Sequence, residues 1–302
     1  MFTRTVAGAI GIVAVTLMIL SGCSSSGGSS GAANGSTSPP ATEQLGAGTA
    51  VAASAPDHVM VVVFENEDAK NIVGGPDAPY LTSLAESGAT FTNAHGETHP
   101  SQPNYLALFS GSTQGVTDDS CPRTFPGPNL AAQLQAAGRT FVGYSEDLPR
   151  AGYTGCDAGN YARRHNPWVN FPALPTSVNQ PSSAMPADFS NLPTVSFLVP
   201  NVCNDMHNCG VAAGDDWARA HLSGYVSWAQ QHNSLLVVTF DEDNGSSANH
   251  IATFLVGPMV TAGASDQQID HYSLLRTLED MYGLPPLGQA ADAEPLSGIW
   301  ID

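Results

Sequence analysis

Residues 99–111 (HPSQPNYLALFSG) place a serine where a polar loop meets a short apolar helix, expected over 104–109. Ser101 occupies the expected N-cap position, and Pro103 lies in the first turn. A hydroxyl there faces free backbone N–H groups and the positive end of the helix dipole, where a phosphate is favoured. The chemistry this suggests is nucleophilic attack by Ser101 on a phosphoryl group. The alternative interpretation is that Ser101 only caps the helix.

Acidic and amide side chains follow three apolar runs that are typical of buried strands, at 59–64, 194–199 and 235–240. Since parallel strands end at one edge of a sheet, these side chains should share a rim with Ser101. Oxygen ligands suit calcium, magnesium or manganese, and nearby histidines allow zinc. Such an ion would lower the pKa of the Ser101 hydroxyl. The side chains are Glu65 and Asn66, then Asn201, Asp205 and His207, then Asp241, Glu242 and Asp243.

The elements that must position these residues alternate along the chain. Further strands are expected near 89–92, 140–144 and 251–256, and further helices over 78–87, 129–137, 215–232 and 272–282. This alternation predicts an α/β domain with a mostly parallel sheet covered on both faces. The segment 145–193 is irregular and rich in Pro and Asn, and we interpret it as a lid.

Five motifs in order carry a family resemblance: residues 64–66 (FEN), 99–105 (HPSQPNY), 199–207 (VPNVCNDMH), 239–245 (TFDEDNG) and 270–280 (DHYSLLRTLED). The chain resembles the bacterial phosphoesterase family of acid phosphatases and phospholipases C, in the alkaline-phosphatase-like superfamily. The resemblance covers most of residues 57–288. It implies a three-layer α/β/α fold, with a single phosphoesterase domain over 56–302.

The resemblance also implies roles for matching residues. Ser101 would be the nucleophile, become phosphorylated and contact the metal. Asn104 would hold a phosphoryl oxygen, while His207, and less directly Asp205, would lie near the leaving oxygen. We expect one divalent cation, because the motifs supply fewer histidines than the two-zinc members of the superfamily use. Its ligands would be Glu65, Asn66, Ser101, Asp241 and Glu242.

Other residues are candidates for substrate binding. His99 lies two residues before Ser101, His250 opens an expected strand, and His271 begins an expected helix. Each of these histidines has a structural alternative as a hydrogen-bonding loop or cap residue. Arg163 and Arg164 form a basic pair in the lid that could clamp a phosphate or a lipid head group, the alternative being a solvated surface pair.

Charge and cysteine content narrow the possible partners. The 302-residue chain has a formal net charge of -18, which disfavours nucleic acid and gives no polybasic attraction to anionic lipid. We expect a monomer.

Four cysteines remain after Cys23, and an even number in an exported chain suggests two disulfides. Four cysteines allow three pairings; because 203 and 209 close a short loop, we pair Cys203 with Cys209 and Cys121 with Cys156.

The first residues read as an export signal. Arg4 and an apolar run precede Leu20-Ser-Gly-Cys23, which resembles the bacterial lipoprotein signal cleaved before an acylated cysteine. Residues 1–22 would be the signal peptide and 23–55 a flexible Gly/Ser-rich tether. An ordinary secretory signal is the alternative. We therefore expect an exported protein, secreted or held at the cell membrane by its lipid anchor alone.

These observations predict a metal-dependent acid phosphatase that cleaves phosphate monoesters through a phosphoserine. The resemblance suggests a phosphoinositide such as phosphatidylinositol 3-phosphate as substrate. A phospholipase C-type diesterase could use the same residues, and a non-catalytic cation-binding surface lipoprotein would bind metal without a covalent intermediate. A Ser-His-Asp esterase fits less well, because the predicted domain contains no GxSxG nucleophile elbow.

The lipoprotein signal predicts a defined modification. Mass spectrometry of protein made in a bacterial host that processes lipoproteins should find a mature chain beginning at a diacylated or triacylated Cys23. A mature N-terminus elsewhere, or an unmodified Cys23, would contradict the lipid anchor.

Overall fold

The computed structural model describes residues 55–246 and 248–301. The predicted signal peptide, Cys23 and almost the whole tether lie outside the described residues. Within the described part, no helix is both long and apolar enough to cross a membrane.

The domain is built on an eight-stranded sheet with the order β10-β2-β9-β8-β1-β7-β3-β6. Every neighbouring pair is parallel except the two pairs made by β9. The sheet is therefore mostly parallel, as predicted. Its strands are β1 (His58–Phe64), β2 (Ala89–His95), β3 (Phe141–Ser145), β6 (Asn179–Pro181), β7 (Val195–Val199), β8 (Ser234–Phe240), β9 (His250–Val256) and β10 (Gly263–Ile269).

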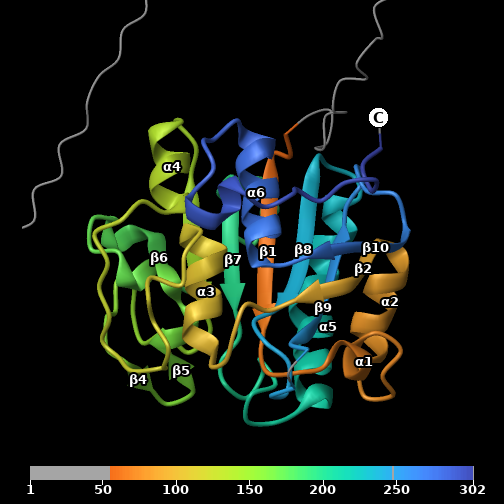
Figure 1. Cartoon of the computed structure of the whole chain (residues 1–302), viewed down its shortest axis with the longest axis horizontal. Helices are drawn as coiled ribbons and strands as arrows, with labels where there is room; N and C mark the ends of the chain where they lie inside the picture. The colour runs from red at the N-terminus through yellow and green to blue at the C-terminus, as the bar shows by residue number, and fades with distance from the viewer. Residues whose placement is uncertain (1–54, 247, 302) are drawn as a thin grey trace, which may run out of the picture. The chain divides into compact units, whose positions relative to one another are not determined.

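Helices cover both faces of the sheet (Figure 1), which confirms the three-layer α/β/α prediction. One face carries α3 (Ser101–Ser110), α4 (Leu130–Ala136) and α6 (His271–Tyr282), and α3 packs against α6. The other carries α2 (Pro79–Ser87) and α5 (Val211–Ala229), which contact each other. The short helix α1 (Ala69–Ile72) contacts β9.

The centre of the core is β1, whose residues from Val59 to Phe64 are at most 1% exposed. A continuous apolar, β-branched run of this kind suits a parallel strand covered on both faces. The register of β1 with β8 runs from His58 opposite Ser234 to Phe64 opposite Phe240. The two strands therefore end side by side, and the residues that follow them emerge at one point of the sheet edge.

The lid segment contains short elements joined by turns. It packs onto the sheet through Trp168, whose ring lies within 6.5 Å of those of Phe109, Phe141 and Phe197. The segment is therefore anchored by an aromatic cluster. Its elements are β4 (Asp157–Ala158), β5 (Tyr161–Ala162), β6 and the 3₁₀ helices η1 (Arg163–His165), η2 (Pro167–Asn170), η3 (Thr176–Val178), η4 (Ser182–Ala184) and η5 (Phe189–Asn191); η6 (Gly288–Ala291) follows α6.

The structure adds two strands to the sheet that the sequence did not predict, β6 and β10, and a short two-stranded pair, β4 and β5, in the lid. The edge strand β10 has the sequence GASDQQI and exposes most of its residues, so no run of buried side chains marked it. The helix α5 also begins four residues before the predicted start at Asp215. These differences concern positions where hydrophobic periodicity is weak.

Both predicted disulfides are present and the predicted pairing is confirmed. Cys121 is bonded to Cys156 across 35 residues, and Cys203 to Cys209 across 6. The first ties the lid to the loop that precedes α4, and the second closes the loop that follows β7.

The two disulfides should differ in their contribution to stability. The chain entropy removed from the unfolded state grows with the length of the closed loop, so loss of Cys121–Cys156 should lower the free energy of unfolding by about 4 kcal/mol and loss of Cys203–Cys209 by about 2 kcal/mol. Urea unfolding of the two Cys→Ala double variants measures this difference. Equal losses, or a larger loss from the short loop, would contradict this ranking.

Candidate active site

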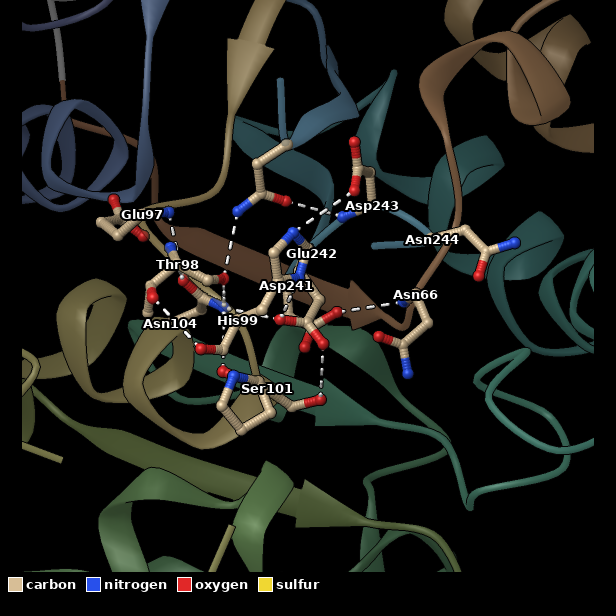
Figure 2. A network of polar contacts seen from close by, with 12 residues as sticks. Asn66, Glu97, Thr98, His99, Ser101, Asn104, Asp241, Glu242, Asp243 and Asn244 are labelled. Carbon is tan, nitrogen blue, oxygen red and sulfur yellow. Dashed lines mark hydrogen bonds and ion pairs between the residues drawn. The ribbon is translucent and has the colours of Figure 1, made fainter. Parts of the chain in front are cut away.

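Ser101 is the first residue of α3, and it points toward the ends of β1 and β8 rather than capping the helix (Figure 2). The N-cap residue is Pro100, and Asp119 accepts the hydrogen bond from the backbone N–H of Gln102. The predicted N-cap role of Ser101 is therefore wrong: Pro100 is the N-cap residue, and the Asp119 carboxylate accepts from a backbone N–H group of the first turn. The hydroxyl of Ser101 instead donates to Glu65 Oε2 at 2.9 Å and lies 3.5 Å from Glu242 Oε1.

Three carboxylates converge around this hydroxyl group. Glu65 directly follows β1, and Asp241 and Glu242 directly follow β8, with exposed fractions of 0%, 1% and 5%. Burial, together with the negative charges of Asp241 and Asp205, raises the pKa of Glu65 well above its usual value. Burial also raises the pKa of Asp241 to about 7 and, with the charge of Asp241, that of Glu242 to about 9.

The donor set fits a divalent cation. Asp241 Oδ1 accepts a hydrogen bond from the backbone N–H of Asn66, but Asp241 Oδ2 is buried and has no hydrogen-bond partner among residues 55–246 and 248–301. A buried carboxylate oxygen without a hydrogen-bond partner, beside two more buried carboxylates, would be stabilised by a positive charge. A second group that could hold an ion comprises Glu65, His165 and Asp205, whose ligand atoms lie within 4.8 Å of one another.

The side chains of Asn104 and His99 secure the loop before Ser101. Asn104 Oδ1 accepts from the backbone N–H groups of Glu97 and Thr98, and its amide nitrogen donates to Thr98 O and to Glu242 Oε2. His99 Nδ1 lies 2.9 Å from the same Glu242 oxygen. The amide of Asn104 is thus engaged by protein groups and lies beside Glu242 (Figure 2), which it helps to orient.

The loop after β7 brings His207 to an open groove of about 560 Å³ that also exposes His99, Asn66 and Glu242. The His207 side chain is exposed, and its backbone N–H donates to Asp205 Oδ1 at 2.9 Å. Asp205 itself is fully buried, and burial raises its pKa to about 7. The side chain of His207 can therefore contact a ligand in the groove. The buried carboxylate of Asp205 holds the backbone of His207 in place through its hydrogen bond.

Three predicted substrate-binding residues have structural partners instead. The buried guanidinium of Arg163 donates to Asn170 and to the backbone carbonyls of Thr154, Arg123 and Val169. The ring of His250 contacts Thr92 O on β2, and His271 bridges Glu97 and Phe240 O. All three side chains are thus engaged by protein groups in the structure. Arg164, by contrast, lies 3.7 Å from Asp157 and its charge lowers the pKa of Asp205, so it remains near the site.

His165 is a site residue that the motifs did not identify. It is 1% exposed, and its ring nitrogens lie 3.1 Å from Glu65 and 3.1 Å from Asp205. It belongs to the irregular lid, where no periodic pattern or strand end predicts what a side chain faces. Its position next to the Arg163–Arg164 pair was the one available signal.

Comparisons with known proteins agree with this geometry. Residues 72–285 match the model of the Phosphoesterase family, and the chain belongs to that family. It is therefore a phosphoric ester hydrolase with an alkaline-phosphatase-like fold, as the resemblance implied.

Two relatives illustrate the range of the family. The chain is 51% identical to a phosphatidylinositol-3-phosphatase from Mycobacterium tuberculosis over 248 residues, which is 81% of this chain and 83% of that protein. It is 32% identical to a phosphate-repressible acid phosphatase from Penicillium chrysogenum, covering 69% of this chain and 55% of the fungal protein. The chain thus spans about half the length of that fungal relative.

Solved structures show the same fold at low sequence identity. An alkaline phosphatase superfamily protein from Vibrio parahaemolyticus superposes with a TM-score of 0.56 at 15% identity, covering 82% of this chain and 72% of that one. A lipoteichoic acid synthase from Listeria monocytogenes also gives 0.56, at 12% identity, covering 79% and 75%.

The buried carboxylates predict a pH-dependent stability. Their pKa values are higher in the folded than in the unfolded protein, so the metal-free protein binds more protons when folded and loses stability as pH rises from about 5 to about 8. Its thermal midpoint should therefore fall over this range, and added Mn²⁺ should raise the midpoint more at about pH 8 than at about pH 5. A metal-free midpoint that rises across this range would contradict the assignment.

Proposed function

We propose that this chain is a metal-dependent acid phosphatase that hydrolyses phosphate monoesters through a phosphoserine at Ser101. The observation that carries the proposal is the placement of the Ser101 hydroxyl, 2.9 Å from Glu65 and 3.5 Å from Glu242, among carboxylates that need a cation. Ser101 also begins a ten-residue helix, whose N-terminal end favours an anion nearby; the backbone N–H of Gln102 there already donates to the Asp119 carboxylate.

One divalent cation, calcium, magnesium, manganese or zinc, would be held by Glu65, Asn66, Ser101, Asp241 and Glu242. When bound, it would supply positive charge that lowers the pKa of the Ser101 hydroxyl and offsets charge on the phosphoryl group. The amide of Asn104 and the ring of His99 keep Glu242 oriented.

The reaction would proceed by double displacement. Ser101 Oγ, its proton released to solvent, attacks phosphorus in line as the bond to the leaving alcohol breaks. His207, exposed at the groove, protonates the leaving oxygen. His207, now without that proton, takes a proton from the water molecule that attacks the phosphoserine; the bond between phosphorus and Ser101 Oγ breaks, which releases phosphate and restores both residues.

The substrate class follows from the relatives and the groove. A protein 51% identical over most of both chains is named a phosphatidylinositol-3-phosphatase, which supports a phosphoinositide head group as substrate. The groove of about 560 Å³ opens to solvent beside His207 and leaves room for an inositol ring. We propose that the protein acts as an exported monomer, secreted or anchored to the cell membrane by its lipid, without a nucleic-acid partner.

Replacement of the nucleophile tests this proposal. The Ser101→Ala variant, loaded with Mn²⁺, should lose roughly 1,000-fold or more of the turnover of a generic phosphomonoester, because the covalent route disappears. Its thermal midpoint should stay near that of wild type, since Ser101 makes no capping hydrogen bond. The control is Ser227→Ala, which alters an exposed serine of α5 and should keep full activity.

A folded, metal-loaded Ser101→Ala protein that retains a tenth of wild-type activity, a loss of only about 1.4 kcal/mol of transition-state stabilisation, would falsify the covalent mechanism. The same assay with a choline phosphodiester separates the two esterase classes. Faster turnover of the diester than of the monoester would indicate a phospholipase C instead.

A further inference from the structure

The two oxygens of Glu65 have different partners. Oε2 accepts from Ser101, on the side where Asp241 and Glu242 converge. Oε1 accepts from the Tyr105 hydroxyl at 2.7 Å and lies 3.1 Å from His165 Nε2. Both groups lie on the Oε1 side of the carboxylate; the Tyr105 contact is a hydrogen bond, whereas His165 Nε2 is buried without a hydrogen-bond partner among the described residues. The orientation that leaves Oε2 beside Ser101 is therefore imposed from the opposite side.

His165 connects Glu65 to the loop that carries His207. While Nε2 faces Glu65, Nδ1 lies 3.1 Å from Asp205 Oδ2, so the two carboxylates occupy opposite nitrogens of one ring. Asp205 in turn accepts from the backbone N–H of His207 and its carbonyl accepts from the backbone N–H of Glu65. The ring therefore lies between the two carboxylates and connects the residue that follows β1 with the loop that follows β7.

The lid fixes the place of the His165 ring. The ring stacks on that of Tyr105, with centroids 5.3 Å apart and planes 9° from parallel. His165 ends η1, and Arg163 at the start of η1 is tied to three backbone carbonyls and to Asn170. The backbone N–H of Arg163 donates to the carbonyl of Cys156, next to the Cys121–Cys156 disulfide. These contacts of the lid fix the His165 imidazole on the side of Glu65 that faces away from Ser101.

We infer that His165 is a positioning residue: from the lid, it orients the Glu65 carboxylate for the cation and for Ser101. This inference rests on the proposed function, in which Glu65 is a ligand of the cation. Groups that hold a ligand from behind typically change metal affinity by about 10- to 100-fold when they are removed. His165 should therefore act on metal affinity first and on turnover only through it.

A matched pair of variants tests which ring nitrogen matters. The amide nitrogen of asparagine can take the place of Nδ1, and that of glutamine the place of Nε2. His165→Asn keeps a polar group facing Asp205 but loses the nitrogen that lies 3.1 Å from Glu65, so it should weaken Mn²⁺ binding to the metal-free protein by about 10- to 100-fold in calorimetric titration. His165→Gln should bind Mn²⁺ close to wild type. The control His232→Asn, at an exposed histidine after α5, should have no effect.

Kinetics at increasing Mn²⁺ provide the second readout. The kcat of His165→Asn should return close to wild type once the ion saturates, with an unchanged KM for a phosphomonoester. Tyr105→Phe removes the hydroxyl that donates to Oε1 and should weaken Mn²⁺ binding in the same direction. This variant keeps the inference testable if the asparagine variant does not fold.

Three results would overturn the inference. Unchanged Mn²⁺ affinity in His165→Asn and Tyr105→Phe would leave His165 with a structural role only. A kcat that stays low at saturating Mn²⁺ would mean that His165 acts on the substrate. A fall from two bound ions to one would make it a ligand of a second metal. Absence of Mn²⁺ binding by wild type would instead refute the metal dependence on which the proposed function rests.

Discussion

The main constraint on the site is the electrostatic repulsion among three buried carboxylates at the edge of the sheet. The register that places Phe64 beside Phe240 brings Glu65 and Asp241 together, and Glu242 completes the group. Burying several such groups without a counter-charge is costly, which is why their pKa values rise. A divalent cation would relieve the repulsion and, in the same place, prepare Ser101 for attack. Under the proposed function, stability and catalysis would therefore depend on the same charge.

The rest of the domain holds this group in place from three directions. The loop before α3 orients Glu242 through His99 and Asn104, and the loop after β7 places His207 above Asp205. The lid supplies His165 from the third side. One disulfide joins the lid to the loop that precedes α4 and the other closes the loop that follows β7, so both irregular segments near the site are covalently constrained.

Strand ends could be predicted from the sequence, and lid contacts could not. Residues 59–64 and 235–240 are long apolar runs, so Glu65, Asp241 and Glu242 could be assigned to one rim from the topology of a parallel sheet. The structure brings all three together with Ser101. The conformation of the lid depends on side-chain hydrogen bonds such as those of Arg163, which carry no periodic signal, so that arginine was predicted to bind substrate and His165 was overlooked. The N-cap of α3 was misassigned because the helix begins one residue earlier, after Pro100, and the Asp119 carboxylate accepts from the backbone N–H of Gln102.

The most direct test of the central claim is anomalous diffraction from crystals of the protein grown with Mn²⁺. The account predicts one strong anomalous peak bounded by the carboxylates of Glu65, Asp241 and Glu242 and by Ser101 Oγ, and its loss in crystals of Asp241→Asn. Absence of a peak at that position in the wild-type protein, or a peak found only elsewhere, would contradict the claim that these carboxylates are buried to hold a cation beside the nucleophile.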